Sequence, residues 1–150
     1  MKKLLVSLLL VTQFSCIGKA QENTIAIQIP TTDSLKTDTL SLLFVGDLMQ
    51  HQGQINAART TEGGYDYSSY FEYVKEEISR ADFAIANLEV TLGGKPYKGY
   101  PAFSAPDEYL TAIHNAGFNV LITANNHSLD RGRKGLERTI LMLDSLRIPY

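Results

Sequence analysis

One stretch decides the fold: Phe118-Asn119-Val120-Leu121-Ile122-Thr123-Ala124-Asn125-Asn126-His127-Ser128-Leu129-Asp130. It begins with a short apolar run, residues 118–122, whose length is typical of a buried strand, and polar side chains follow almost at once. In open α/β sheets, ligands bind beyond the carboxyl ends of the strands. The sequence therefore predicts an α/β protein with a functional site at the end of this strand.

The polar residues of this stretch have the chemistry of a site. Asn126 and His127 carry atoms that bind metals, and imidazole is also the commonest general acid or base. Asp130 follows His127 by three residues, so its carboxylate can hold one nitrogen of the imidazole ring. Asn125 has two interpretations, because its side chain either bonds backbone groups in a tight turn or contacts a substrate.

The amino terminus predicts export. Lys2 and Lys3 precede an apolar run at residues 4–11, and residues 18–20 are small enough at the positions that a signal peptidase reads. The apolar run is too short to remain in a membrane as a spanning helix. We therefore interpret residues 1–20 as a signal peptide, which places the mature protein in the periplasm or at the cell surface.

Cys16, the single cysteine, gives an alternative to simple secretion, because cleavage just before it would allow a lipid anchor. With no second cysteine, the chain has no internal disulfide. Removing residues 1–20 leaves 11 basic and 16 acidic residues, a formal charge of −5. This charge argues against a nucleic acid as partner.

The rest of the chain alternates between strand and helix patterns. Residues 21–39 are polar and interpreted as a flexible tether, with a short strand considered at residues 25–29. The predicted strands are 40–45, 83–86 and 118–123. A capping box at Ser69 and Glu72 predicts the start of the first helix. The second helix is expected from Pro106 to Gly117, and the last is expected to contain Leu136, Ile140, Leu143 and Leu146 and to stop before Pro149.

This order predicts right-handed crossovers and a parallel sheet. Parallel strands release the chain at one edge, so Asp47, Glu89, Asn126 and His127 are expected to converge there. Carboxylates, an amide and an imidazole suit Mg, Mn, Fe or Zn. We expect two divalent ions, with Glu89 as the bridging candidate.

Five motifs in order resemble the CapA family of poly-γ-glutamate capsule-biosynthesis proteins. They are Gly46-Asp47-Leu48-Met49, residues 81–89 (ADFAIANLE), residues 102–106 (AFSAP), Ala116-Gly117-Phe118 and residues 124–132 (ANNHSLDRG). The match runs from about Leu40 to the end of the chain. The resemblance implies a protein that serves the synthesis or export of an anionic surface polymer.

The family is similar in fold to the calcineurin-like metallophosphoesterases, so the resemblance implies an αββα sandwich. Residues 40–150 would supply its N-terminal βαβαβα half. The resemblance further implies Asp47, Glu89 and Asn126 as metal ligands, His127 as acid or transition-state stabiliser, and Asp130 as the residue that orients His127.

The sequence departs from the phosphoesterase pattern in two places. Those enzymes carry Asp-x-His at the first strand, whereas here His51 follows Asp47 by four positions, and their bridging residue is usually Asp rather than Glu. Histidines from a carboxyl-terminal half would complete such a site. We therefore expect the sequence to be truncated, the 150 residues to be inactive alone, and an unpaired strand edge to be exposed.

Arg131 and Arg133 crowd the start of the last predicted helix. They either bind a phosphate or a polymer carboxylate as substrate contacts, or they form a solvated basic face. The leading hypothesis is thus an exported CapA-like protein with a metal-dependent phosphoesterase-type site. Its alternatives are a non-catalytic polymer-binding or export subunit that assembles with membrane-associated capsule-synthesis proteins, and a metal-dependent hydrolase of the polymer amide bond.

Overall fold

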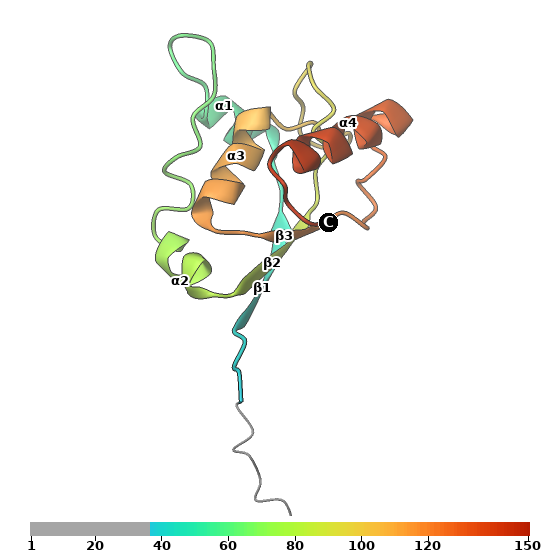
Figure 1. The fold of residues 1–150 in the computed structure, drawn as a ribbon. Coiled ribbons are helices and arrows are strands. Elements are labelled where there is room, and N and C mark those ends of the chain that lie inside the picture. The colour runs from blue at the N-terminus through green and yellow to red at the C-terminus, as the bar shows by residue number, and fades with distance from the viewer. Residues whose placement is uncertain (1–36) are drawn as a thin grey trace, which may run out of the picture. The chain divides into compact units, whose positions relative to one another are not determined.

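The computed structural model describes residues 37–150 (Figure 1). The predicted signal peptide, nearly all of the tether and the short strand at 25–29 lie outside the described residues. No helix among residues 37–150 has the length and apolar character to cross a membrane. The elements, in chain order, are β1 (Leu42–Leu48), α1 (Gln52–Ala57), α2 (Lys75–Arg80), β2 (Phe83–Leu88), α3 (Asp107–Ala116), β3 (Val120–Ile122) and α4 (Gly132–Ser145).

The three strands form one parallel sheet in the order β1-β2-β3. Leu42 lies opposite Phe83, and Ile85 lies opposite Val120. The predicted α/β class and parallel strand order are therefore confirmed, with β2 in the middle. This arrangement is consistent with part of a metallophosphoesterase-like fold.

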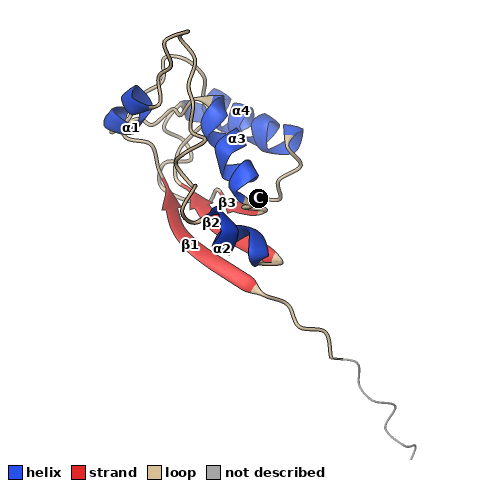
Figure 2. Cartoon of the chain, turned by 90° about the vertical axis from the view of Figure 1, so that its left-hand side faces the viewer, coloured by secondary structure: helices blue, strands red, loops and turns tan. Residues whose placement is uncertain are grey.

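One face of the sheet is covered by helices and carries the core (Figure 2). Ala84, Ala86 and Leu88 alternate along β2 and are at most 2% exposed, and Leu121 of β3 is fully buried beside them. They share one buried cluster with apolar residues of the helices, namely Ile78 of α2, Leu110 and Ile113 of α3, and Leu143 of α4. This burial supplies the main stabilisation of the unit.

The opposite face of the sheet is open among the described residues. Leu42, Phe44, Phe83 and Ile122 are exposed by 57%, 68%, 43% and 46%. Their alternation with the core residues follows the period of two along a strand. A sheet that is apolar on both faces is typical of one covered on both sides.

A bulge in β1 decides on which face Asp47 lies. Phe44 lies opposite Ile85, yet Asp47 lies opposite Asn87, so β1 has one more residue than β2 between these two pairs. Because a shift of one residue turns every later side chain to the other face, the bulge brings Asp47 to the face shared by Phe44 and Asn87.

The helices differ from the prediction near the amino terminus. The predicted helix beginning at Ser69 is shorter: α2 begins at Lys75, and residues 69–74 form turns. Phe71 instead packs against Phe118 and Tyr109, with ring centroids 6.0 and 6.4 Å apart. These contacts with the core outweigh the local capping box.

Helix α1 was not predicted because it has six residues and a single buried one, Ile55, so it lacks an apolar period.

The prediction for α3 is confirmed, and Gly117 ends this helix with a φ of +109°. A side chain there would also meet Ser79 of α2, whose Cα lies 2.9 Å from the Cβ position. Glycine is therefore required at position 117.

Strand β3 has three residues, fewer than the predicted run 118–123. Phe118 is instead a core residue, and the Asn119 side chain joins β2, since its Oδ1 accepts a hydrogen bond from the Ala84 N–H at 2.9 Å. The last helix, α4, ends at Ser145, ahead of Pro149 as predicted.

Candidate functional site

The ends of β1 and β2 meet through one side chain, Asn87. Its Nδ2 donates to Asp47 Oδ1 at 2.8 Å and to Glu89 Oε2 at 2.7 Å. Its Oδ1 accepts a hydrogen bond from Asn125 Nδ2 at 2.9 Å. The amide of Asn87 therefore connects polar residues that lie at or just beyond the ends of three different strands.

Asn125 also shapes the turn after β3. Its Oδ1 accepts the His127 backbone N–H at 3.0 Å, and its Nδ2 donates to the carbonyl oxygen of Leu88 at 3.0 Å. This is the turn-forming role that the sequence left open. The substrate contact assigned to Asn125 stays a prediction.

His127 is held by Asp130. Its Nδ1 lies 2.9 Å from Asp130 Oδ2, and the backbone N–H of Phe103 donates to the same oxygen at 2.8 Å. Because a carboxylate is an acceptor, this contact places the imidazole proton on Nδ1 and leaves Nε2 free to accept. Nε2 faces Glu89, with Oε1 at 3.9 Å.

Phe103 shields this histidine. The two rings meet edge to face with centroids 4.7 Å apart, and the His127 and Asp130 side chains are 14% and 11% exposed. His51, which follows Asp47 by four positions, packs against the same Phe103 ring with centroids 5.2 Å apart, and its backbone N–H donates to Gln54 at the start of α1. Phe103 thus restricts water around the His127–Asp130 pair.

Two carboxylates lie close together at this edge. Desolvation raises the pKa of Glu89 first, and the hydrogen bond and negative charge of nearby Asp47 raise it further. Two adjacent acids with one shared amide donor form a place where a cation would relieve repulsion.

A metal ion would need amide ligands here. Among residues 37–150, no three His, Cys, Asp or Glu side chains converge to hold a metal ion. The donor set is instead two carboxylates with neighbouring amides, which are oxygen ligands that suit Mg and Mn. The side chain of Asn126 is exposed and makes no hydrogen bond within the described residues, so its oxygen is free to bind.

Arg131 and Arg133, the two arginines predicted to contact substrate, make different contacts. Arg131 Nη1 donates to the carbonyl oxygen of Pro96 at 2.8 Å, so it anchors the loop before α3. Its side chain also crosses Gly93, where an added Cβ would lie 2.7 Å away. Arg133 is 88% exposed and pairs with Glu137 of the same helix at 2.6 Å. Their part in substrate binding stays a prediction.

Sequence reasoning missed Asn87 and Phe103 as site residues. Asn87 had a usable signal, because it precedes Glu89 by two positions and therefore shares its face of the strand. Phe103 had none, since it comes from the loop between β2 and α3, and its contact with His127 depends on tertiary packing.

The fold and the site define an α/β protein with acidic, amide and imidazole side chains gathered at the ends of parallel strands. Residues 41–150 match the family described as bacterial capsule synthesis protein PGA_cap. The chain therefore belongs to the CapA family of capsule-biosynthesis proteins, as its motifs predicted.

Two relatives from bacilli are similar to most of this chain. The capsule biosynthesis protein CapA of Bacillus anthracis is 30% identical over 123 residues, which cover 77% of this chain and 28% of the relative. The PGA biosynthesis protein CapA of Bacillus subtilis (strain 168) is 31% identical over 132 residues, which cover 85% of this chain and 32% of the relative. The chain thus spans about a third of the length of these relatives.

Proposed function

We propose that this CapA-family chain supplies part of a metal-dependent phosphoesterase-type site that serves the synthesis or export of an anionic capsule polymer. One observation carries the proposal: the carboxylates of Asp47 and Glu89 are held on either side of the Asn87 amide. A structural role alone does not require two acids beside one amide, because desolvation and the nearby Asp47 carboxylate raise the pKa of Glu89.

Asp47, Glu89 and Asn126 would hold the metal ions, two in number, of the Mn, Zn, Fe or Mg class. Bound there, the ions would supply Lewis-acid activation of a phosphoryl oxygen and of water. Among the residues of this chain, His127 accepts or gives a proton at Nε2. Asp130 keeps the ring in the required tautomer, and Phe103 limits the access of water.

We assign substrate binding to three polar residues near the proposed metal site. Arg133, with its exposed guanidinium, would attract a phosphoester or a polymer carboxylate, and Arg131 and Asn125 would shape the adjoining loops.

We further propose that the protein is exported, on the pattern of residues 1–20, with Cys16 as the candidate lipid anchor. Membrane-associated capsule-synthesis proteins would then be its partners.

The metal site is tested by measuring bound metal. We expect the protein incubated with Mn²⁺ to retain metal after dialysis, and Glu89→Gln to lose most of it. Glu72→Gln, at an exposed glutamate in the turns before α2, is the matched control and should leave the content unchanged. Equal metal content in Glu89→Gln and in the unsubstituted protein would contradict the site.

The reaction is tested by product analysis. A generic phosphodiester and poly-γ-glutamate should be offered to the protein together with Mn²⁺. Hydrolysis of the phosphodiester that His127→Gln abolishes supports the proposal. Cleavage of polymer amide bonds would instead identify an amide hydrolase, and polymer binding without any cleavage would identify a non-catalytic subunit.

A further inference from the structure

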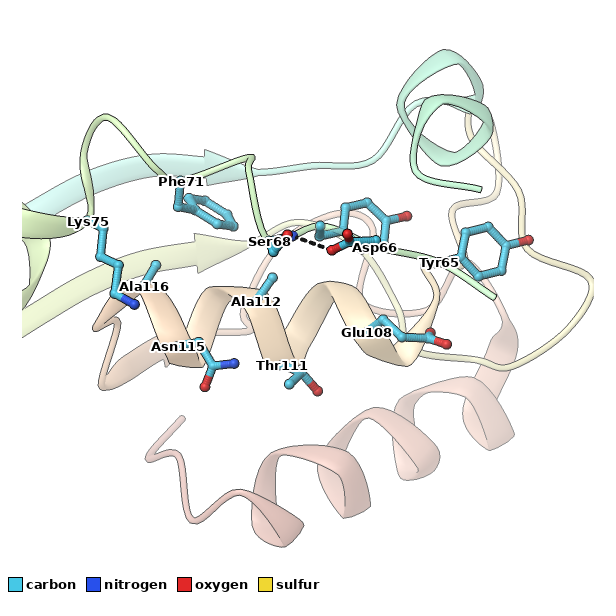
Figure 3. Close-up of a pocket in the computed structure, with 11 residues that line it drawn as sticks. Tyr65, Asp66, Ser68, Phe71, Lys75, Glu108, Thr111, Ala112, Asn115 and Ala116 are labelled. Atoms are coloured by element: carbon cyan, nitrogen blue, oxygen red, sulfur yellow. Dashed lines mark hydrogen bonds between the residues drawn. The ribbon is translucent and has the colours of Figure 1, made fainter. Parts of the chain in front are cut away.

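A cavity of about 380 Å³ lies between α3 and residues 65–75, separate from the strand-end site (Figure 3). Its floor is the stripe of α3 that carries Glu108, Ala112 and Ala116, and its wall includes Tyr67 and Phe71. Residues spaced by four along a helix lie on one face, so this stripe is a continuous strip of the α3 surface. The volume lies in the range of small-ligand sites, which is about 300–1,000 Å³.

The cavity has opposite charges at its two ends. Lys75 lies beside Ala116 at one end, and Glu108 lies near Tyr65 at the other (Figure 3). Neither Lys75 nor Glu108 has an ion-pair partner among residues 37–150. Eight residues of helix separate Glu108 from Ala116, a length of about 12 Å at a rise of about 1.5 Å per residue.

The wall also contains a buried polar atom without a partner. Tyr67 is 2% exposed, and its hydroxyl makes no hydrogen bond within the described part of the chain. Leaving such a hydroxyl unpaired costs about 1–3 kcal/mol. Because the hydroxyl has almost no exposed surface, a ligand in the cavity would contact the ring of Tyr67 and not this atom.

The charges decide which class of ligand fits. An acidic polymer would meet one cation, Lys75, and two anions, Asp66 and Glu108, so it is disfavoured. A phosphate-rich ligand is disfavoured for the same reason. A purely apolar ligand would offer no partner to the charged groups at the two ends. An elongated zwitterion matches the charges at both ends and the apolar middle formed by Phe71, Ala112 and Ala116.

We propose that this cavity binds a short linear peptide with free termini, its carboxylate at Lys75 and its ammonium group at Glu108 and Asp66. A tripeptide in an extended conformation spans about 10 Å, which fits the distance along α3. This site takes a different ligand from the strand-end site, and its proposal does not depend on a metal.

The test is an NMR titration with trialanine, compared with its N-acetylated and C-amidated forms. We expect saturable shifts of the Thr111 and Ala112 amide signals, and a loss of affinity of about tenfold when either end of the peptide is capped. Lys75→Met should bind the free and the amidated peptide equally, and Glu108→Gln should bind the free and the acetylated peptide equally. Lys134→Met, at an exposed lysine outside the cavity, is the control.

Two results would overturn the proposal. One is the absence of saturable shifts at Thr111 and Ala112 with millimolar trialanine. The other is binding that capping the peptide, Lys75→Met and Glu108→Gln all leave unchanged, because such binding would not read the charges at the two ends. Both substituted residues are exposed on helices, so the variants are expected to fold and the comparison remains interpretable.

Discussion

The same three strands form both faces of the sheet, but among the described residues helices cover one face and leave the other open. Leu121 and Ile122 are neighbours in β3, yet the first is fully buried and the second is 46% exposed. The covered face is the core, packed by α2, α3 and α4 (Figure 2). The open face is apolar along Phe44 and Phe83 and becomes polar at Asp47 and Asn87.

The comparison separates the packed core from the candidate site. Side chains on the covered face are apolar and contribute through burial. The candidate site lies at the carboxyl ends of the strands on the open face, and the β1 bulge is what brings Asp47 there. A single strand can therefore carry core and site on its two faces with little interference between them.

The largest expected effect is a loss of stability when a residue of the covered face is substituted. Leu121→Ala should lower the free energy of unfolding by about 2–5 kcal/mol, because it leaves a cavity in a packed core. Ile122→Ala, its neighbour on the open face, should cost about 1 kcal/mol or less. Urea unfolding of both variants measures the difference, and equal losses would show that the two faces are not distinct.

The next effect is expected at the strand ends. Asp130→Asn should lower the free energy of unfolding by about 1–3 kcal/mol, because Asp130 Oδ2 accepts from both His127 and the Phe103 backbone. Asp144→Asn, at an exposed acid near the end of α4, is the control for thermal unfolding. A variant as stable as the control would mean that Asp130 does not hold the loop.

A smaller effect of opposite sign is expected at Glu89. Its pKa is raised in the folded state, so its contribution is favourable below the unfolded pKa and is lost as the pH rises through the folded pKa. Without added metal, the melting temperature should therefore fall over that interval, and Glu89→Gln should flatten the fall and melt a few degrees higher at neutral pH. Identical pH profiles would contradict the raised pKa of Glu89 that desolvation and the nearby Asp47 carboxylate produce.

The smallest effect on stability is expected on the open face, at Phe44. Phe44→Thr should change the free energy of unfolding by no more than about 0.5 kcal/mol, since Phe44 is 68% exposed. The variant should also self-associate less, because it removes apolar surface from that face. Light scattering measures the association. A destabilisation as large as that of Leu121→Ala would show that Phe44 is packed in solution.

The sequence predicted most of this fold because its strands are short apolar runs that end in polar residues. It also predicted that Asp47 and Glu89 would meet, since parallel strands end at one edge. It did not predict the β1 bulge, although Gly46 lies at the shifted register and a glycine inside a strand often marks a bulge, nor α1, which has one buried residue. The Ser69 capping box was misleading because Phe71 gains more from packing on Phe118 than a local helix would supply.

The site was predicted by residue type, and its connections were not. Strand order brought Asn87 between two carboxylates, and tertiary packing brought Phe103 over His127. Such contacts join segments far apart in the chain, so no local pattern encodes them.

The central claim, a divalent cation at the ends of the strands, is tested most directly by adding Mn²⁺ and following side-chain amide signals by NMR. Asn87 and Asn119 mark opposite ends of β2, since Asn87 bonds Asp47 and Asn119 bonds Asp82 and Ala84. We predict that less than one equivalent of Mn²⁺ broadens the Asn87 signals more strongly than those of Asn119. Broadening of both to the same extent, or of neither, would contradict the account.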